Sequence, residues 1–290
     1  MQHPQRSRDS VIDRRRSSRP AALVAALSLL LLAALAPSLR AADEDPFVGR
    51  VAVITGTSSG LGRELAEIAA AREMRLVLVD IDAGPSEAMA RRIVQEGGEA
   101  VFVEADLADP AQRGQIIETA VERFGTVDYL FNNAGYSYLA TLEQMDLDMA
   151  HHLMEVNYWA YVDLAQAAIA VMKEQGSGTI YNTSSILGVR PGPPGLGHYA
   201  ATKFALVGMF QVVAREVAPY GIRVFVGAPA GMRTNISKNS VGPLADPELD
   251  RAADWEDPAI AAEDIFAGLL GDEVMLYPGY IGREMGDESD

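Results

Sequence analysis

The chain has 290 residues, of which 49% are hydrophobic and 22% charged, as in an ordinary globular protein. It contains no cysteine, which excludes disulfides and thiol chemistry, and its four histidines do not follow a metal-binding spacing, so we expect no metal site. Seven arginines and two aspartates give residues 1–42 a charge of +5, which leaves −21 on residues 43–290; so acidic a body repels phosphate backbones, and we expect no nucleic-acid partner.

Residues 1–42 have the pattern of an export signal. An arginine-rich start is followed by an apolar run at 21–36 and then by small residues. The run is shorter than the about 20 residues of a membrane span, and the arginines at 14–16 also permit a twin-arginine signal. We expect export to the periplasm or the medium, or a retained N-terminal anchor with membrane association through 21–36. The alternative is a misassigned start and a cytoplasmic protein.

From Phe47 onward, short β-rich runs alternate with amphipathic stretches. The runs are 51–55, 75–80, 100–106, 127–133, 178–185, 222–229 and 273–278. Between them, stretches such as 110–125 have apolar residues at helical spacing. This alternation predicts a doubly wound α/β fold, with a mostly parallel sheet of about seven strands and helices on both faces. We expect residues 43–290 to form a single domain, with 235–257 as a substrate-binding segment over one end of the sheet.

The first predicted strand runs into the glycine-rich sequence TGTSSGLG, residues 55–62. Gly56 allows a sharp turn out of the strand, Gly60 lets the backbone approach a pyrophosphate, and Gly62 lets the helix pack close to the strand. The N-terminus of the following helix offers unpaired N–H groups to phosphates. An ordinary glycine-rich turn has the same letters, but the position between strand and helix favours a dinucleotide site.

Three motifs together resemble the short-chain dehydrogenase/reductase family: Gly-x-x-x-Gly-x-Gly at 56–62, NNAG at 132–135 and YAATK at 199–203. The resemblance extends from about Val51 to Thr234 and implies a Rossmann-fold catalytic domain that binds NAD or NADP. The cofactor-binding residues that it implies are Thr55, Gly56, Ser58, Ser59, Gly60, Leu61, Gly62, Asp80, Asp106, Leu107, Asn133, Ala134, Gly135, Tyr199, Lys203, Pro229, Met232 and Thr234. Among these, Asp106 and Leu107 match the pair that contacts the adenine in the family.

The choice between the two dinucleotides depends on Asp80, which ends the second predicted strand. A carboxylate there can accept hydrogen bonds from the ribose hydroxyls, and it repels a 2′-phosphate. NADP-preferring relatives carry a basic residue at the positions of Ser59 or Ile81. We therefore expect NAD to be preferred over NADP. Asp82 can share this role, and Asp80 as a solvated turn residue is the alternative interpretation.

The resemblance implies a catalytic group of four residues. Tyr199 and Lys203 lie four residues apart on one helix face; the lysine and the oxidised nicotinamide lower the tyrosine pKa so that it can act as acid and base. Ser184 and Ser185 both end the fifth strand, and we expect Ser185 to bind the substrate oxygen. Asn157 matches the asparagine that holds a relay water at a helix kink.

These residues predict an oxidoreductase that interconverts a secondary alcohol and a ketone with NAD(P). The alternative is an exported nucleotide-binding protein without turnover, since free NAD is expected to be scarce outside the cytoplasm. One departure from the family is Ala230, which stands where glycine is usual, with Gly231 one place later. The substrate stays open, and we expect a homodimer or another homo-oligomer.

Overall fold

The computed structural model describes residues 45–246, 255–280 and 283–284. The predicted export signal at 1–42 and part of the predicted substrate-binding segment, 247–254, lie outside these residues. The chain divides into two units, Met1–Pro46 and Phe47–Asp290, and all the elements below belong to the second. Within the ranges just given, none of the helices combines the length and the apolar character that crossing a membrane requires.

In the described part of the chain, seven strands form one parallel sheet in the order β3-β2-β1-β4-β5-β6-β7. The strands are β1 (Val51–Thr55), β2 (Arg75–Asp80), β3 (Ala100–Glu104), β4 (Tyr129–Asn132), β5 (Gly178–Thr183), β6 (Ile222–Gly227) and β7 (Met275–Leu276). The predicted doubly wound Rossmann fold is confirmed. The strand order changes direction between β1 and β4, which is where such sheets bind ligands.

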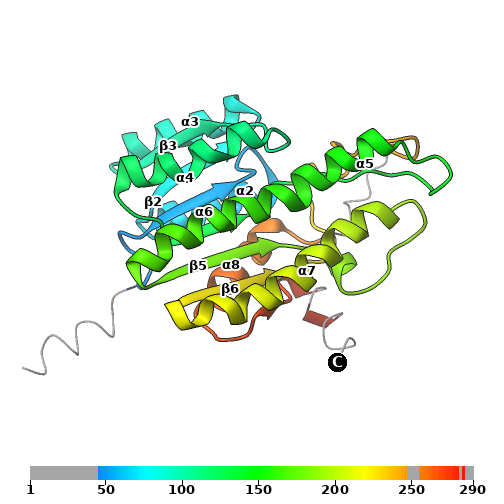
Figure 1. Ribbon diagram of the computed structural model, residues 1–290. Helices are drawn as coiled ribbons and strands as arrows, with labels where there is room; N and C mark the ends of the chain where they lie inside the picture. The colour runs from blue at the N-terminus through cyan, green and yellow to red at the C-terminus, as the bar shows by residue number, and fades with distance from the viewer. Residues whose placement is uncertain (1–44, 247–254, 281–282, 285–290) are drawn as a thin grey trace, which may run out of the picture. The chain divides into compact units, whose positions relative to one another are not determined.

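Helices cover both faces of the sheet (Figure 1). One face packs α4 (Pro110–Phe124), α6 (Ala160–Gln175) and α7 (Gly197–Val217) against Val51 and Val53 of β1. The other packs α2 (Gly60–Ala71), α3 (Ala83–Gln95) and α8 (Pro258–Gly268) against Ala52 and Ile54. Alternate residues of one apolar strand therefore serve two cores, which explains why the strands are apolar throughout.

The remaining elements are α5 (Leu147–Met154), the π-helix η1 (Glu155–Trp159) and two 3₁₀ turns, η2 (Ile186–Gly188) and η3 (Ala218–Tyr220). Figure 1 shows α5 continuing through η1 into α6 as one long helix, whose α5 end extends past the carboxyl ends of the strands. This end of the sheet carries the loops that build the site.

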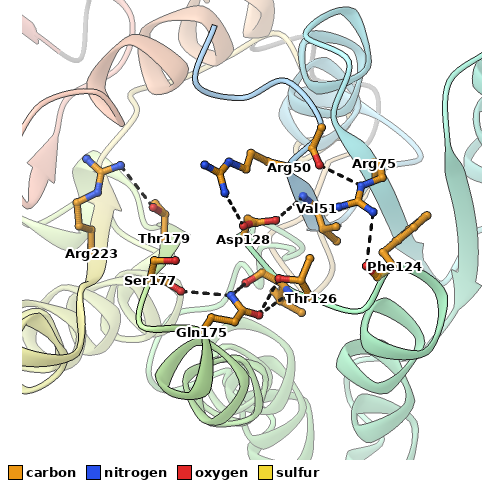
Figure 2. A network of polar contacts seen from close by, with 12 residues as sticks. Arg50, Val51, Arg75, Phe124, Thr126, Asp128, Gln175, Ser177, Thr179 and Arg223 are labelled. Atoms are coloured by element: carbon orange, nitrogen blue, oxygen red, sulfur yellow. Dashed lines mark hydrogen bonds and ion pairs between the residues drawn. The ribbon is translucent and has the colours of Figure 1, made fainter. Parts of the chain in front are cut away.

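A polar network closes the opposite end of the sheet, at the start of the strands (Figure 2). The Asp128 carboxylate accepts hydrogen bonds from the backbone N–H of Val51 (2.8 Å) and from Arg50 Nη1 (3.3 Å). The Gln175 side chain accepts from the backbone N–H of Val127 (3.0 Å) and donates to its carbonyl oxygen (3.0 Å). These bonds tie β1, β4 and the end of α6 together, away from the candidate site.

Candidate active site

A cavity of about 610 Å³ lies at the carboxyl ends of the strands. Most of the residues predicted from the sequence line it: Gly56, Ser58, Ser59, Gly60, Leu61, Asp80, Asp106, Leu107, Asn133, Ala134, Gly135, Ser185, Tyr199, Lys203, Pro229, Met232 and Thr234. Residues that are up to about 180 positions apart in the sequence are thus gathered around one space. The remaining predicted residues, Thr55, Gly62 and Asn157, are not part of the lining.

Thr55 and Gly62 support the lining from behind. The Thr55 hydroxyl oxygen accepts hydrogen bonds from the backbone N–H groups of Asn133 (2.9 Å) and Ala134 (3.0 Å), so it joins the end of β1 to the NNAG segment. A Cβ on Gly62 would lie 2.1 Å from the carbonyl oxygen of Gly56. Glycine at 62 therefore allows α2 to begin directly against the turn that leaves β1.

The glycine turn has the geometry of a phosphate cradle. Gly56 has a φ of +80°, and a Cβ there would lie 2.9 Å from the Cα of Ala134. Gly60 has a φ of +56°, and its neighbour is the Thr234 side chain, which a Cβ would meet at 2.9 Å. Ser59 at the N-cap of α2 makes no side-chain capping bond, so the first N–H groups of α2 are available for phosphate oxygens. These residues fit a dinucleotide pyrophosphate.

The carboxylate of Asp80 is fixed at the end of β2. Its Oδ2 accepts from the backbone N–H of Ser58 (2.8 Å), and its Oδ1 accepts from that of Asp82 (2.9 Å). Asp82 caps α3 by accepting from the Gly84 N–H (3.3 Å), and it is not among the residues lining the cavity. Of the two aspartates, Asp80 is therefore the one that lines the cavity.

Tyr199 and Lys203 lie in the first turns of α7, with 8% and 3% of their surfaces exposed. Burial raises the pKa of Tyr199 to about 12, against a smaller lowering by hydrogen bonding with Ser185. Burial also lowers the pKa of Lys203 to about 7. The Lys203 ammonium donates to the carbonyl oxygen of Thr183 (2.9 Å) rather than to the Tyr199 phenol. Burial therefore disfavours the charged form of each side chain; at neutral pH this lowers the charge of Lys203, whereas Tyr199 is protonated there in any case.

The two neighbouring serines have separate environments. Ser184 is buried, and its hydroxyl donates to the carbonyl oxygen of Lys203 (2.9 Å). The half-buried Ser185 caps η2 by accepting from the Leu187 N–H (3.1 Å), and it is the serine that interacts with Tyr199. Ser184 thus fixes α7 to the end of β5, whereas Ser185 stands beside the phenol in the cavity.

Asn157 lies fully buried in η1, where one turn of the long helix has the wider π form. Its side chain accepts from the backbone N–H of Tyr136 (3.2 Å) and donates to the Tyr136 carbonyl oxygen (2.9 Å). π turns inside α-helices are rare and frequent at functional sites. The asparagine therefore connects a distorted helix to the residue that follows the NNAG segment.

The turn after β6 accommodates the exchange of glycine for Ala230. The carbonyl oxygen of Pro229 accepts from the backbone N–H of Ile186 (2.9 Å), which ties the turn to η2 beside Ser185. A Cβ on Gly231 would lie 2.8 Å from the indole of Trp255. The glycine is thus needed one position later because Trp255 packs on the backbone there.

Sequence reasoning missed one polar pair in the cavity. The Tyr136 hydroxyl and His152 Nδ1 share a hydrogen bond of 2.7 Å, and both residues line the cavity. Burial is the main cause that raises the pKa of Tyr136 to about 12, and the charge of Asp106 adds to it. Tyr136 directly follows NNAG and His152 lies five residues before Asn157, so their nearness to motif residues was the available signal.

The chain matches the sequence model of short chain dehydrogenases over residues 50–243. It belongs to the short-chain dehydrogenase/reductase family. Among curated relatives, an oxidoreductase named BOA17 from Botryotinia fuckeliana is 36% identical over 189 residues, which is 65% of this chain and 68% of the relative. Levodione reductase from Leifsonia aquatica is 35% identical, over 71% of this chain and 78% of that enzyme.

Solved structures of the family have the same fold. A member from Burkholderia phymatum in complex with NAD superposes with a TM-score of 0.74 and 27% identity, covering 80% of this chain and 89% of that one. A member from Burkholderia cenocepacia in complex with NADP has a TM-score of 0.70 and 28% identity, covering 80% of this chain and 97% of that one. The protein is therefore a short-chain oxidoreductase, of a family in which both nicotinamide dinucleotides occur.

Proposed function

We propose that the protein is an NAD-dependent dehydrogenase/reductase that interconverts a secondary alcohol and a ketone. The observation that carries this proposal is that Tyr199, Lys203 and Ser185 line the same cavity as the glycine turn and Asp80. The nicotinamide of a dinucleotide whose pyrophosphate lies on the turn would exchange hydride with a substrate carbon beside the phenol.

Each catalytic side chain has one task in this reaction. Ser185 holds the substrate oxygen next to the Tyr199 hydroxyl. Tyr199, whose pKa is raised to about 12, is protonated at neutral pH and donates its proton to the carbonyl oxygen during reduction. During oxidation the phenol must first lose that proton, and the Lys203 ammonium favours this step. Asn157 holds the segment at Tyr136 and, with a water, carries protons between Lys203 and solvent: inward to restore Tyr199 after reduction, and outward during oxidation.

The preference for NAD rests on Asp80 and on its surroundings. Its two carboxylate oxygens are already fixed by backbone N–H groups and retain lone pairs for ribose hydroxyls. Neither Ser59 nor the exposed Ile81 offers a positive charge to a 2′-phosphate. The negative charge of Asp80 would repel such a phosphate by up to about 4 kcal/mol at 4 Å separation and an effective dielectric near 20.

We propose that the substrate is neutral and moderately apolar. The apolar residues that line the cavity include Leu139, Leu187, Leu196, Ile236 and Trp255. Leu187, Leu196 and Ile236 pack against the cluster that contains Tyr199. Among the described lining residues, the basic ones are Lys203 and His152, and Lys203 is used in catalysis. A carboxylate or phosphate on the substrate would therefore find few cationic partners in a strongly acidic protein.

The test is a titration of purified protein with NADH and NADPH, followed by a panel of neutral ketones and alcohols. Tyr199→Phe should abolish turnover and leave NADH affinity nearly unchanged. The matched control is Tyr220→Phe, because Tyr220 is exposed beyond the far end of α7. Equal turnover of Tyr199→Phe and wild type would contradict the mechanism, and NADPH preference would contradict the argument from Asp80.

We further propose a homodimer and export. Exposed apolar side chains on α7, namely Phe204, Met209 and Val212, together with Trp159 of η1, support a self-association surface. Light scattering of the purified protein tests the dimer. The export proposal rests on the sequence of residues 1–42, and a reporter enzyme that is active only outside the cytoplasm, fused after residue 42, tests it.

A further inference from the structure

Arg113 is a buried charge that the catalytic mechanism above does not use. It lies on the core-facing side of α4, where the buried residues at helical spacing, Ile116, Ile117 and Ala120, are apolar. Only 3% of its side chain is exposed. A guanidinium in such a place needs hydrogen-bond acceptors on all sides, because it stays charged at any physiological pH.

The acceptors come from two separate parts of the site. Arg113 Nε donates to the carbonyl oxygen of Leu107 (2.7 Å), in the loop after β3 that lines the cavity. Arg113 Nη2 donates to the Glu155 carboxylate (2.7 Å) and to the Glu155 carbonyl oxygen (3.3 Å). Glu155 begins η1, two residues before Asn157. One side chain therefore bridges the Asp106–Leu107 loop and the π turn.

The carbonyl oxygen of Glu155 takes part in the π turn. It accepts the backbone N–H of Ala160, five residues later, where a regular α-helix would use the N–H of Trp159. The bond from Arg113 gives this oxygen a second donor, from outside the helix. Arg113 thus stabilises the distorted backbone at which Asn157 reaches Tyr136.

Stability alone does not account for an arginine here. Arg113 Nη1 also donates to the Asp163 carboxylate (2.6 Å). The side chains of Asp163 and Glu155 are 42% and 39% exposed, so both carboxylates are partly hydrated. Apolar residues commonly replace buried ion pairs without loss of stability, and the neighbouring positions of α4 are apolar already. What an apolar side chain cannot supply is the forked set of donors that reaches Leu107 and Glu155 together.

We propose that Arg113 is a positioning residue that fixes both the adenine side of the cofactor site, through Leu107, and the proton-relay side, through the Glu155–Asn157 turn. This inference rests on the proposed function. Loss of Arg113 should weaken binding of the adenine nucleotide and, separately, slow turnover when the enzyme is saturated with cofactor.

The test compares Arg113→Met with Asp163→Asn. Asp163→Asn weakens the ion pair to the same guanidinium, but Asp163 contacts neither the loop at Leu107 nor η1 through the bonds described. We expect Arg113→Met to raise the Kd for NADH and for AMP, and to lower kcat at saturating NADH, each by about tenfold or more. Asp163→Asn should remain within about twofold of wild type in all three quantities.

The use of AMP and of saturating NADH separates the two effects, because AMP reports only on the adenine side. If Arg113→Met changes the Tm but leaves the AMP Kd and kcat at the values of Asp163→Asn, Arg113 is merely structural and the proposal is overturned. If Arg113→Met does not fold, Arg113→Lys decides: its single ammonium cannot reach Leu107 and Glu155 together, so wild-type values of Kd and kcat would overturn the proposal. A wild-type protein that fails to bind NADH would instead contradict the proposed function itself.

Discussion

The Lys203 ammonium lies 5.7 Å from the centroid of the Tyr199 ring, and its hydrogen bond goes to the carbonyl oxygen of Thr183 at 2.9 Å. Burial moves the two pKa values in opposite directions, to about 7 for Lys203 and about 12 for Tyr199. Both shifts disfavour the charged forms. Near neutral pH the cost in stability falls on Lys203, because Tyr199 is protonated in the folded and in the unfolded chain. Perturbed pKa values of this kind are common at functional sites.

Removal of Lys203 should stabilise the protein in a pH-dependent way. The pKa of Lys203 is 10.5 in its ordinary state and about 7 in the folded protein, so between these values the unfolded chain binds the extra proton. Burial of this lysine therefore lowers the free energy of unfolding. The loss is complete below pH 7 and fades as the pH rises toward 10.5. We expect Lys203→Met to be inactive, with a higher Tm than wild type near neutral pH and a difference that shrinks under alkaline conditions.

Thermal unfolding across this pH range, without added dinucleotide, measures the effect. The Thr183 carbonyl oxygen keeps a donor in the variant, because the Tyr161 hydroxyl also reaches it (3.4 Å). Lys173→Met is the matched control: Lys173 is exposed on α6, so its removal relieves no burial of charge and should not raise the Tm near neutral pH. A Lys203→Met protein that is less stable than wild type at every pH would contradict the lowered pKa of Lys203 in the folded protein.

Much of the fold could be predicted because its signals are local. β1 and β2 have the predicted bounds, since each is an apolar β-rich run that ends at a turn or a carboxylate. The later strands end one to two residues before the predicted positions, because residues such as Ser185 and Pro229 leave the sheet to line the cavity. The last strand was predicted over 273–278, and only Met275–Leu276 pair with β6.

Those site residues that belong to sequence motifs could be predicted. Residues whose place in the site depends on contacts with distant parts of the chain could not. Arg113 falls on the apolar face of α4, which was a visible anomaly, but its partners Glu155 and Asp163 are 42 and 50 residues away. Helical spacing places Asn157 in a long helix without showing that one turn is π. The turn accepts hydrogen bonds from Tyr136 and Arg113, and these bonds exist only after the chain has folded.

The two serines at the end of β5 should differ sharply in their effects. Ser185→Ala removes the hydroxyl beside Tyr199, and we expect kcat/KM to fall by about 10²–10³, as for the loss of one donor to a developing oxyanion. Ser184→Ala removes a bond to the Lys203 carbonyl oxygen, and we expect a loss of about 1 kcal/mol in the free energy of unfolding, with activity within about threefold. Steady-state kinetics and urea unfolding of both variants test this. A larger kinetic loss for Ser184→Ala would reverse the assignment.

The charge of Asp80 should set the preference between dinucleotides. Asp80→Asn removes that charge and exchanges one acceptor oxygen for a donor group. We expect NADH to bind about tenfold more weakly and NADPH to bind more tightly. Asp82→Asn removes an equal charge two residues away and keeps the oxygen that caps α3. Fluorescence titrations of both variants should therefore show altered selectivity in Asp80→Asn alone; equal changes in both would mean that only the overall charge matters.

A pair of glycine substitutions should separate the glycine turn from ordinary helix energetics. A Cβ on Gly62 would lie 2.1 Å from the Gly56 carbonyl oxygen, so Gly62→Ala must displace the start of α2 from the turn. We expect it to lose at least the about 1–3 kcal/mol typical of overpacking, and to lose NADH binding as well.

The matched control is Gly114, which lies inside α4, where a Cβ would meet no atom within 4 Å outside its own helix backbone. Gly114→Ala should therefore gain about 0.5–1 kcal/mol through helix propensity and leave NADH binding unchanged. Urea unfolding and NADH titration of the two variants measure both quantities. Unimpaired NADH binding by Gly62→Ala would show that close packing at this turn is not required for the cofactor.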